Sequence, residues 1–204
     1  MTARLWLMAG LLVLASAWAG PLPQLARQSL AAHMALHMSV VGIGVPLVAA
    51  GIAAFRRPGQ LLGGLALPIA VSLLDFVVIW SWHSPALHLA SRNDPWIMVL
   101  EQASFAAVSL LVWLVALSYP ARGEAALAGA ATLFFTSMHM TLLGALLGLA
   151  PRPLYDGHVH NSPLDPLVDQ QLGGIIMLAV GGTVYLIGGL VLVARVLRPR
   201  EAQP

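Results

Sequence analysis

The sequence predicts an all-α protein, a polytopic membrane bundle of about six transmembrane helices with both termini in the cytoplasm. Hydrophobic residues make up 59% of its 204 positions and charged residues only 9%, whereas a soluble domain carries about 25% charged residues. The apolar residues gather in long segments, and the arginines gather on one side of those segments. These observations indicate an integral membrane protein with a single transmembrane domain over residues 1–204.

Six segments are long and apolar enough, or nearly so, to cross the hydrocarbon core, which takes roughly 20 residues. They are Leu5–Gly20, Leu30–Phe55, Leu61–Trp82, Trp96–Tyr119, Ala125–Ala150 and Leu172–Leu197. The first segment has an alternative interpretation as a secretory signal, because Arg4, an apolar run and Ala17-Trp18-Ala19 follow one another as in such a signal. Its cleavage would leave five spans with the same sidedness.

The positive-inside rule orients the bundle. With the N-terminus in the cytoplasm, the inner side holds Arg4, Arg56, Arg57, Arg122, Arg195, Arg198 and Arg200. The outer side then holds only Arg27, Arg92 and Arg152. In this orientation all seven histidines fall on the outer side, and residues 151–169 form the longest outer loop.

Composition also excludes several classes of site. The chain has no cysteine, so disulfides and thiolate metal ligands are ruled out and any metal must be bound by His, Met, Asp or Glu. All ten basic residues are arginine, and no basic tract suggests nucleic acid binding. Neither a Gly-x-Ser-x-Gly element nor a His-Glu-x-x-His element is present, so no hydrolytic enzyme is predicted.

A histidine pair opens the second segment at its outer end. His33 and His37 are four residues apart, so on a helix they share a face and can converge on one metal ion. Met34 and Met38 repeat this spacing, turned about 100° around the helix. Imidazole combined with thioether suits copper, and thioether favours Cu(I). The stretch therefore predicts a copper site at the outer face.

Other histidines lie on the same predicted side. His83 closes the third segment, and His139 and Met140 lie in the outer half of the fifth, so all three are candidate ligands. The remaining histidines are expected in outer loops, where such residues often have no specific role: His88, His158 and His160.

Two acids fall within the predicted spans. Asp75 lies in the outer half of the third segment, and Glu101 lies about one and a half turns inside the fourth. An ionisable group at such depth costs roughly 2.5–3.5 kcal/mol on insertion scales, so it usually faces a partner or a cavity. Either acid could orient a histidine, bind a metal directly or carry protons.

The run before the last segment reads Asp165-Pro166-Leu167-Val168-Asp169-Gln170-Gln171-Leu172-Gly173-Gly174. This run resembles the CtaG-like family of cytochrome c oxidase assembly factors, whose signature places Asp-Gln-Gln and small residues before the last helix. The His-Met-x-x-His-Met element at residues 33–38 and the Trp-His-x-Pro element at residues 82–85 are also similar to that family. The likeness touches three separate regions and covers most of the chain.

The resemblance implies a helical protein of the bacterial inner membrane that matures haem-copper oxidases by delivering copper to their catalytic copper centre. It carries functional positions over to His33, Met34, His37, Met38, His83, Asp169 and Gln170. This chain departs from many members in having six predicted spans rather than seven, and Glu101-Gln102 where members often have an acid-histidine pair. Asp169 and Gln170 also lie where the last helix begins, so Asp169 could equally well cap that helix.

The leading hypothesis is a copper-binding assembly factor, not an enzyme, that holds Cu(I) at the periplasmic face. The ion would pass by ligand exchange to the partner, which is a haem-copper oxidase subunit or a periplasmic copper chaperone. One alternative is a membrane cytochrome with haem between His37 and His139. Another is a copper transporter, or a proton-coupled one that uses Asp75 and Glu101, although the cytoplasmic half offers no acid or histidine to complete a relay.

Overall fold

The computed structural model describes residues 2–55, 66–118, 124–155 and 163–197, and within these ranges every regular element is a helix. Two of the elements are π-helical and are labelled η. In chain order the helical elements are α1 (Ala3–Ala19), α2 (Leu22–Ala26), α3 (Leu30–Met38), η1 (Ser39–Gly44), α4 (Val45–Phe55), α5 (Ala66–Trp82), α6 (Pro85–Asn93), α7 (Pro95–Ser118), α8 (Glu124–Gly148), α9 (Pro166–Ile176), η2 (Met177–Gly182) and α10 (Thr183–Leu197).

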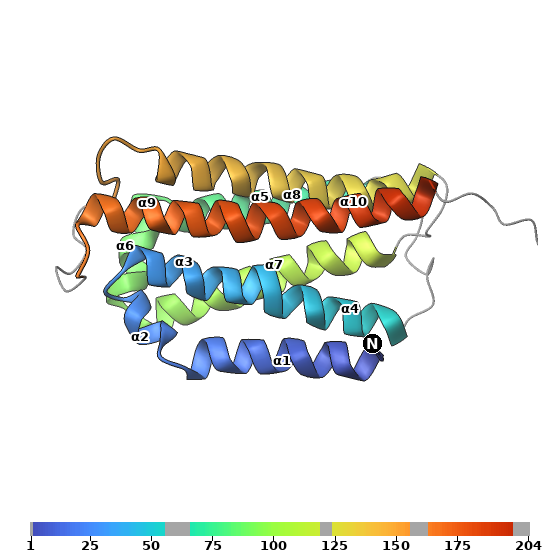
Figure 1. Ribbon diagram of the computed structural model, residues 1–204, viewed down its shortest axis with the longest axis horizontal. Helices are drawn as coiled ribbons and strands as arrows, with labels where there is room; N and C mark the ends of the chain where they lie inside the picture. Colours follow the sequence, from blue (N-terminus) through green and yellow to red (C-terminus); the bar gives the residue numbers. More distant parts are fainter. Residues whose placement is uncertain (1, 56–65, 119–123, 156–162, 198–204) are drawn as a thin grey trace, which may run out of the picture.

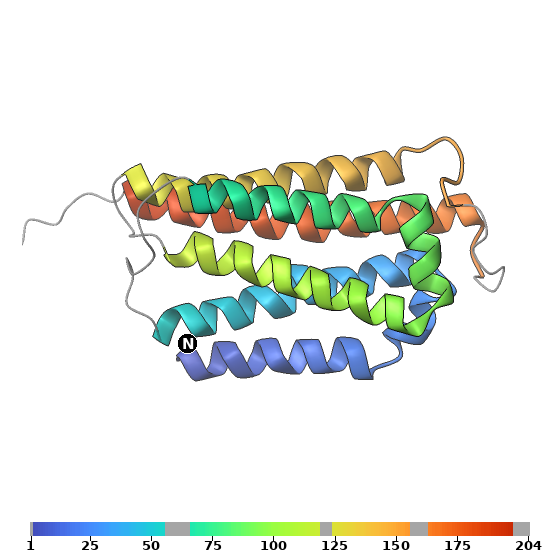
Figure 2. The same ribbon diagram turned by 180° about the vertical axis from the view of Figure 1, so that it is seen from behind.

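The long helices run side by side along one axis, while α2 and α6 lie across one end of the bundle (Figures 1 and 2). We call this the α6 end; α3, α7 and α9 begin there and α5 and α8 finish there. Helix α1 begins and α10 finishes at the opposite end, as expected for termini on the same side of a membrane (Figure 1). The seven predicted inner arginines include Arg4 on α1 and Arg195 on α10, and the other five lie outside the described residues.

Among the described residues, four helices are long and apolar enough to cross a membrane: Leu30–Phe55, Pro95–Ser118, Leu127–Gly148 and Pro166–Leu197. Helices α5 and α6 together make a fifth candidate, bent by 68° at the break between them. Helix α1 is apolar but only 17 residues long. Length and composition thus identify four or five of the six predicted spans, and α1 occupies the position of the remaining one.

Two predicted boundaries were wrong, and proline explains both. The last long helix begins at Pro166, six residues before Leu172, because Asp165 caps it and Pro166 suits a first helical position. Asp169 therefore lies on a helix rather than in the loop predicted over residues 151–169. Residues after Pro85, expected as a loop, instead form α6, with proline again at the helix start.

A proline also lies inside the Leu30–Phe55 helix, next to its π-helical segment η1. In π-helical register the residue at position 46 would donate to the carbonyl of Val41, but Pro46 has no N–H. The Tyr185 hydroxyl lies 3.2 Å and the Ser109 hydroxyl 3.4 Å from that carbonyl oxygen, and the two hydroxyls are 2.7 Å apart. Side chains of α7 and α10 thus satisfy a backbone group in the middle of the bundle.

Helix α1 packs closely against η1 and α4 through glycines. A Cβ atom on Gly10 would lie 2.7 Å from the carbonyl oxygen of Gly44, and one on Gly51 would lie 2.8 Å from the amide nitrogen of Leu7. Glycine permits this close backbone approach in membrane helices. Residues 3–19 thus form a helix that packs against the bundle.

Glycines also join α8 to α9. A Cβ atom on Gly174 would lie 2.6 Å from the carbonyl oxygen of Gly144, whereas one on Gly148 would have no contact nearer than 3.7 Å. We therefore expect Gly174→Ala to destabilise the protein by about 1–3 kcal/mol, the usual penalty of overpacking. Thermal unfolding in detergent measures the effect.

Gly148→Ala is the matched control, since the same methyl group fits at that position. Equal melting temperatures for the two variants would contradict the account of α8–α9 packing.

Candidate metal centre

Three buried side chains form a cluster at the α6 end, which we call the His–His–Glu cluster. His33 and His37 come from α3 and Glu101 comes from α7, and each side chain is at most 2% exposed. The Glu101 Oε1 atom lies 3.4 Å from Nε2 of His33 and 3.8 Å from Nε2 of His37. One ligand atom from each residue lies within 4.8 Å of the other two. Two imidazoles and a carboxylate at this separation are a ligand set that a transition metal ion accepts.

Local sequence places each member of the cluster. The spacing of His33 and His37 puts both rings on one face of α3, as expected, and their Nε2 atoms are 2.5 Å apart. Helix α7 starts at Pro95, where the Asp94 carboxylate accepts from the backbone N–H of Trp96 at 2.7 Å. Glu101 then faces α3 on the second turn of that helix.

Asp169 caps the helix that carries the two histidines. Its carboxylate accepts from the Ser29 hydroxyl at 2.6 Å and from the backbone N–H groups of Leu30 at 2.6 Å and Ala31 at 3.3 Å. These amides belong to the first turn of α3, so a negative charge also meets the positive end of the helix dipole. The expected capping of the last helix by Asp169 was wrong, because Asp165 fills that role.

The two glutamines that follow attach α9 to its other neighbour. Gln170 accepts from the backbone N–H of Leu154 at 2.7 Å and donates to the carbonyl of Leu147 at 3.4 Å. Gln171 donates to the carbonyl of Ala150 at 3.3 Å. The Asp-Gln-Gln run thus connects α9 to the start of α3 and to the end of α8.

His83 lies next to the cluster in a form suited to metal binding. Its ring centre is 6.1 Å from that of His37, and its Nδ1 donates to the carbonyl of Ile79 at 2.7 Å. A carbonyl only accepts, so in neutral His83 the Nε2 atom carries a lone pair. That atom is buried and has no hydrogen-bond partner in the described part of the chain.

His88 is a buried member of this region that sequence reasoning assigned to a loop. It lies on α6 with its ring centre 5.0 Å from that of His33 and 4.3 Å from that of Tyr155. The Tyr155 hydroxyl in turn donates to the carbonyl of His83 at 2.9 Å. The Ser84-Pro85 helix start was the signal that could have placed His88 on a helix. His158 and His160 lie outside the described residues.

Charged and ionisable groups around His88 are also buried. Arg92 is 8% exposed, its Nε lies 3.4 Å from Nε2 of His88, and its two terminal nitrogens have no hydrogen-bond partner among the described residues. Burial raises the pKa of Tyr155 above its usual value, and the nearby Arg92 cation opposes that shift. His88, Arg92 and Tyr155 are therefore enclosed at the α6 end, whereas Arg27 and Arg152 remain exposed there.

His139 belongs to a different group. Its Nε2 atom lies 3.0 Å from Oδ2 of Asp75, which also accepts from the Thr136 hydroxyl at 2.8 Å. Asp75 precedes His83 by eight residues, which is about two helical turns, and the His139 imidazole remains close enough to His83 for the two rings to interact electrostatically. Of the roles left open for the two acids, the structure places Asp75 beside one histidine and Glu101 within the His–His–Glu cluster.

The predicted methionine ligands lie toward the C-terminal helices. A Cβ atom on Gly181 of η2 would meet the sulfur of Met38 at 3.1 Å and that of Met140 at 3.6 Å. A Cβ atom on Gly173 of α9 would meet Cγ of Met34 at 3.1 Å. All three methionines are buried in these contacts.

The chain matches the family described as cytochrome c oxidase caa3 assembly factor (Caa3_CtaG) over residues 2–199. No curated protein and no solved structure matches it.

Removal of the Asp169 cap provides a test of how the histidine helix is held. We expect Asp169→Ala to lower the free energy of unfolding by about 1–3 kcal/mol, because buried N–H groups of α3 lose their acceptor. Hydrogen exchange of the Leu30 and Ala31 amides should accelerate in the same variant. Asp165→Ala is the control, since it removes only the cap of α9; faster exchange at Leu30 in the control as well would contradict this assignment.

Proposed function

The chain belongs to the cytochrome c oxidase caa3 assembly factor family, and we propose that it supports oxidase assembly by binding copper at the His–His–Glu cluster and delivering it. The family match spans nearly the whole chain, so assembly of cytochrome c oxidase is its general role. Copper is then the cargo of the protein rather than a permanent cofactor.

The observation that carries the proposal is the convergence of His33, His37 and Glu101 in a buried position. Burial of a carboxylate beside two imidazoles is unfavourable without a compensating cation, and the buried Arg92 cation near Glu101 supplies part of that compensation. A copper ion bound there would add a positive charge directly at the carboxylate, and the Glu101 carboxylate would neutralise Cu(I). His83, with an unshared lone pair at Nε2, offers a further ligand beside the cluster.

The ligand types favour transfer over permanent storage. Nitrogen and oxygen ligands without thiolate release copper more readily than a closed thiolate site does. Met38 follows His37 on α3 and its sulfur lies near that of Met140 beside Gly181, and thioethers favour Cu(I) over Cu(II). We therefore assign Cu(I) as the cargo and a haem-copper oxidase subunit, or a periplasmic copper chaperone, as the exchange partner.

The arginine distribution supports a periplasmic position for the cluster. The cluster lies at the α6 end, opposite the end where α1 begins with Arg4 and α10 finishes with Arg195. By the positive-inside rule the α6 end faces outward, which in the bacterial inner membrane is the periplasm. There the site would meet copper outside the cytoplasm.

Copper binding by purified protein under reducing conditions tests the proposal. We expect the protein to bind about one Cu(I) per chain. We expect His33→Gln/His37→Gln to weaken Cu(I) binding by at least about 100-fold, because loss of a residue that only hydrogen-bonds to a metal ligand already weakens metal binding by about 10–100-fold. Competition with a Cu(I) chelator measures the affinity, and oxidase maturation in cells carrying each variant gives the biological readout.

His139→Gln is the matched control, because it changes a buried histidine that pairs with Asp75 and keeps a hydrogen-bond donor. Unchanged copper affinity and oxidase maturation in the double variant would contradict the proposal. Strong absorbance near 410 nm, typical of bis-imidazole haem, would instead favour the cytochrome alternative.

A further inference from the structure

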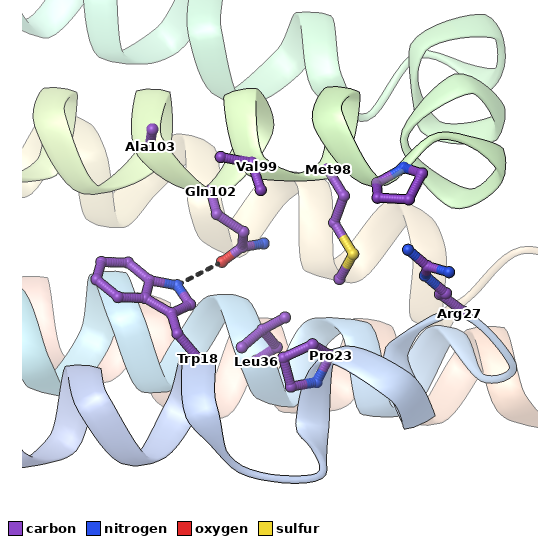
Figure 3. Close-up of a pocket in the computed structure, with 9 residues that line it drawn as sticks. Trp18, Pro23, Arg27, Leu36, Met98, Val99, Gln102 and Ala103 are labelled. Atoms are coloured by element: carbon purple, nitrogen blue, oxygen red, sulfur yellow. Dashed lines mark hydrogen bonds between the residues drawn. The ribbon is translucent and has the colours of Figure 1, made fainter.

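Gln102 connects the His–His–Glu cluster to a cavity on the side of the bundle. Its Nε2 atom lies 3.1 Å from Nδ1 of His37, and its Oε1 atom accepts from Nε1 of Trp18 at 3.5 Å (Figure 3). The cavity lies between α1, α2, α3 and α7 and has a volume of about 380 Å³. Gln102 is 6% exposed and extends from α7 toward the indole of Trp18 on α1 (Figure 3).

The indole determines which way the Gln102 amide points. Indole N–H is only a donor, so the amide must present its oxygen to Trp18 and its NH₂ group to His37. Facing a donor, Nδ1 of His37 must accept and cannot carry a proton. Neutral His37 therefore carries its proton on Nε2, and that N–H donates to Nε2 of His33 at 2.5 Å.

This tautomer is not the one that binds a metal at the cluster. The Nε2 atom of His37 faces Glu101 and His33, so a metal there requires its lone pair, and the proton must move to Nδ1. An N–H at Nδ1 needs an acceptor, which Gln102 can supply only after its amide turns over. The turned amide presents NH₂ to the Trp18 N–H, and the bond to Trp18 is lost.

We propose that Gln102 is a positioning residue whose amide orientation, set by Trp18, controls whether His37 is ready to bind the metal. The inference rests on the proposed function, because it assigns His37 as a ligand. The bond to Trp18 stabilises the metal-free orientation. The cavity wall adds to this, because its lining residues, which include Leu36, Met98 and Val99, offer no side-chain oxygen to the turned NH₂ group.

The proposal predicts that removing a hydrogen bond strengthens metal binding. Trp18→Phe keeps an aromatic ring but frees the Gln102 amide to turn. Because the metal-free protein then loses one stabilising hydrogen bond, we expect Cu(I) affinity to rise by about threefold to tenfold. Trp96→Phe is the control, because Trp96 is 80% exposed at the start of α7. Unchanged or weaker binding in Trp18→Phe would overturn the proposal, since a purely structural role predicts one of those results.

A measurement without copper separates this proposal from the proposed function. Nitrogen-15 NMR of the metal-free protein, labelled at histidine, should show His37 protonated at Nε2 in the wild type. In Gln102→Glu the carboxylate accepts from both Trp18 and His37, so the His37 proton should move to Nδ1. Protonation at Nδ1 in the wild type, or an unmoved proton in Gln102→Glu, would overturn the proposal. Absence of copper binding with the expected tautomers would overturn only the proposed function.

Discussion

The carboxylate of Asp169 is the interaction on which the site depends. It accepts three hydrogen bonds from Ser29 and the first turn of α3, and so attaches the C-terminal helix to the helix that carries both histidines of the cluster. Little water reaches this position, so N–H groups that lost this acceptor would remain unsatisfied. The orientation of His33 and His37 toward Glu101 follows from how α3 is anchored.

Polar groups inside this apolar bundle are arranged in separate layers. The α6 end holds the His–His–Glu cluster with His83 and His88, and a second layer further along α5 holds Asp75 with Thr136 and His139. Between helices α7, η1 and α10, the Ser109 and Tyr185 hydroxyls satisfy the carbonyl of Val41. Each layer supplies partners for buried polar groups that lipid cannot solvate.

Sequence reasoning predicted the helical membrane fold and the His33–His37 pair, because both follow from periodicities within single segments. Contacts between segments were harder to predict. The i, i+4 rule placed the two imidazoles on one face but could not say that Glu101 and Gln102 of a distant helix would meet them. The Asp-Gln-Gln run was recognised, yet its carboxylate caps α3 and not the adjacent helix, since capping depends on which helix start lies nearby in space. His88 was expected in a loop because the third segment was predicted to close at His83, whereas Pro85 starts a further helix.

Copper X-ray absorption spectroscopy of the Cu(I)-loaded protein tests the central claim most directly, because it identifies the atoms bound to the ion. The account predicts nitrogen and oxygen neighbours, with the multiple-scattering signature of two or more imidazoles from His33, His37 and the adjacent His83. A shell dominated by sulfur would contradict it and would place the ion at the thioethers of Met34, Met38 and Met140 instead.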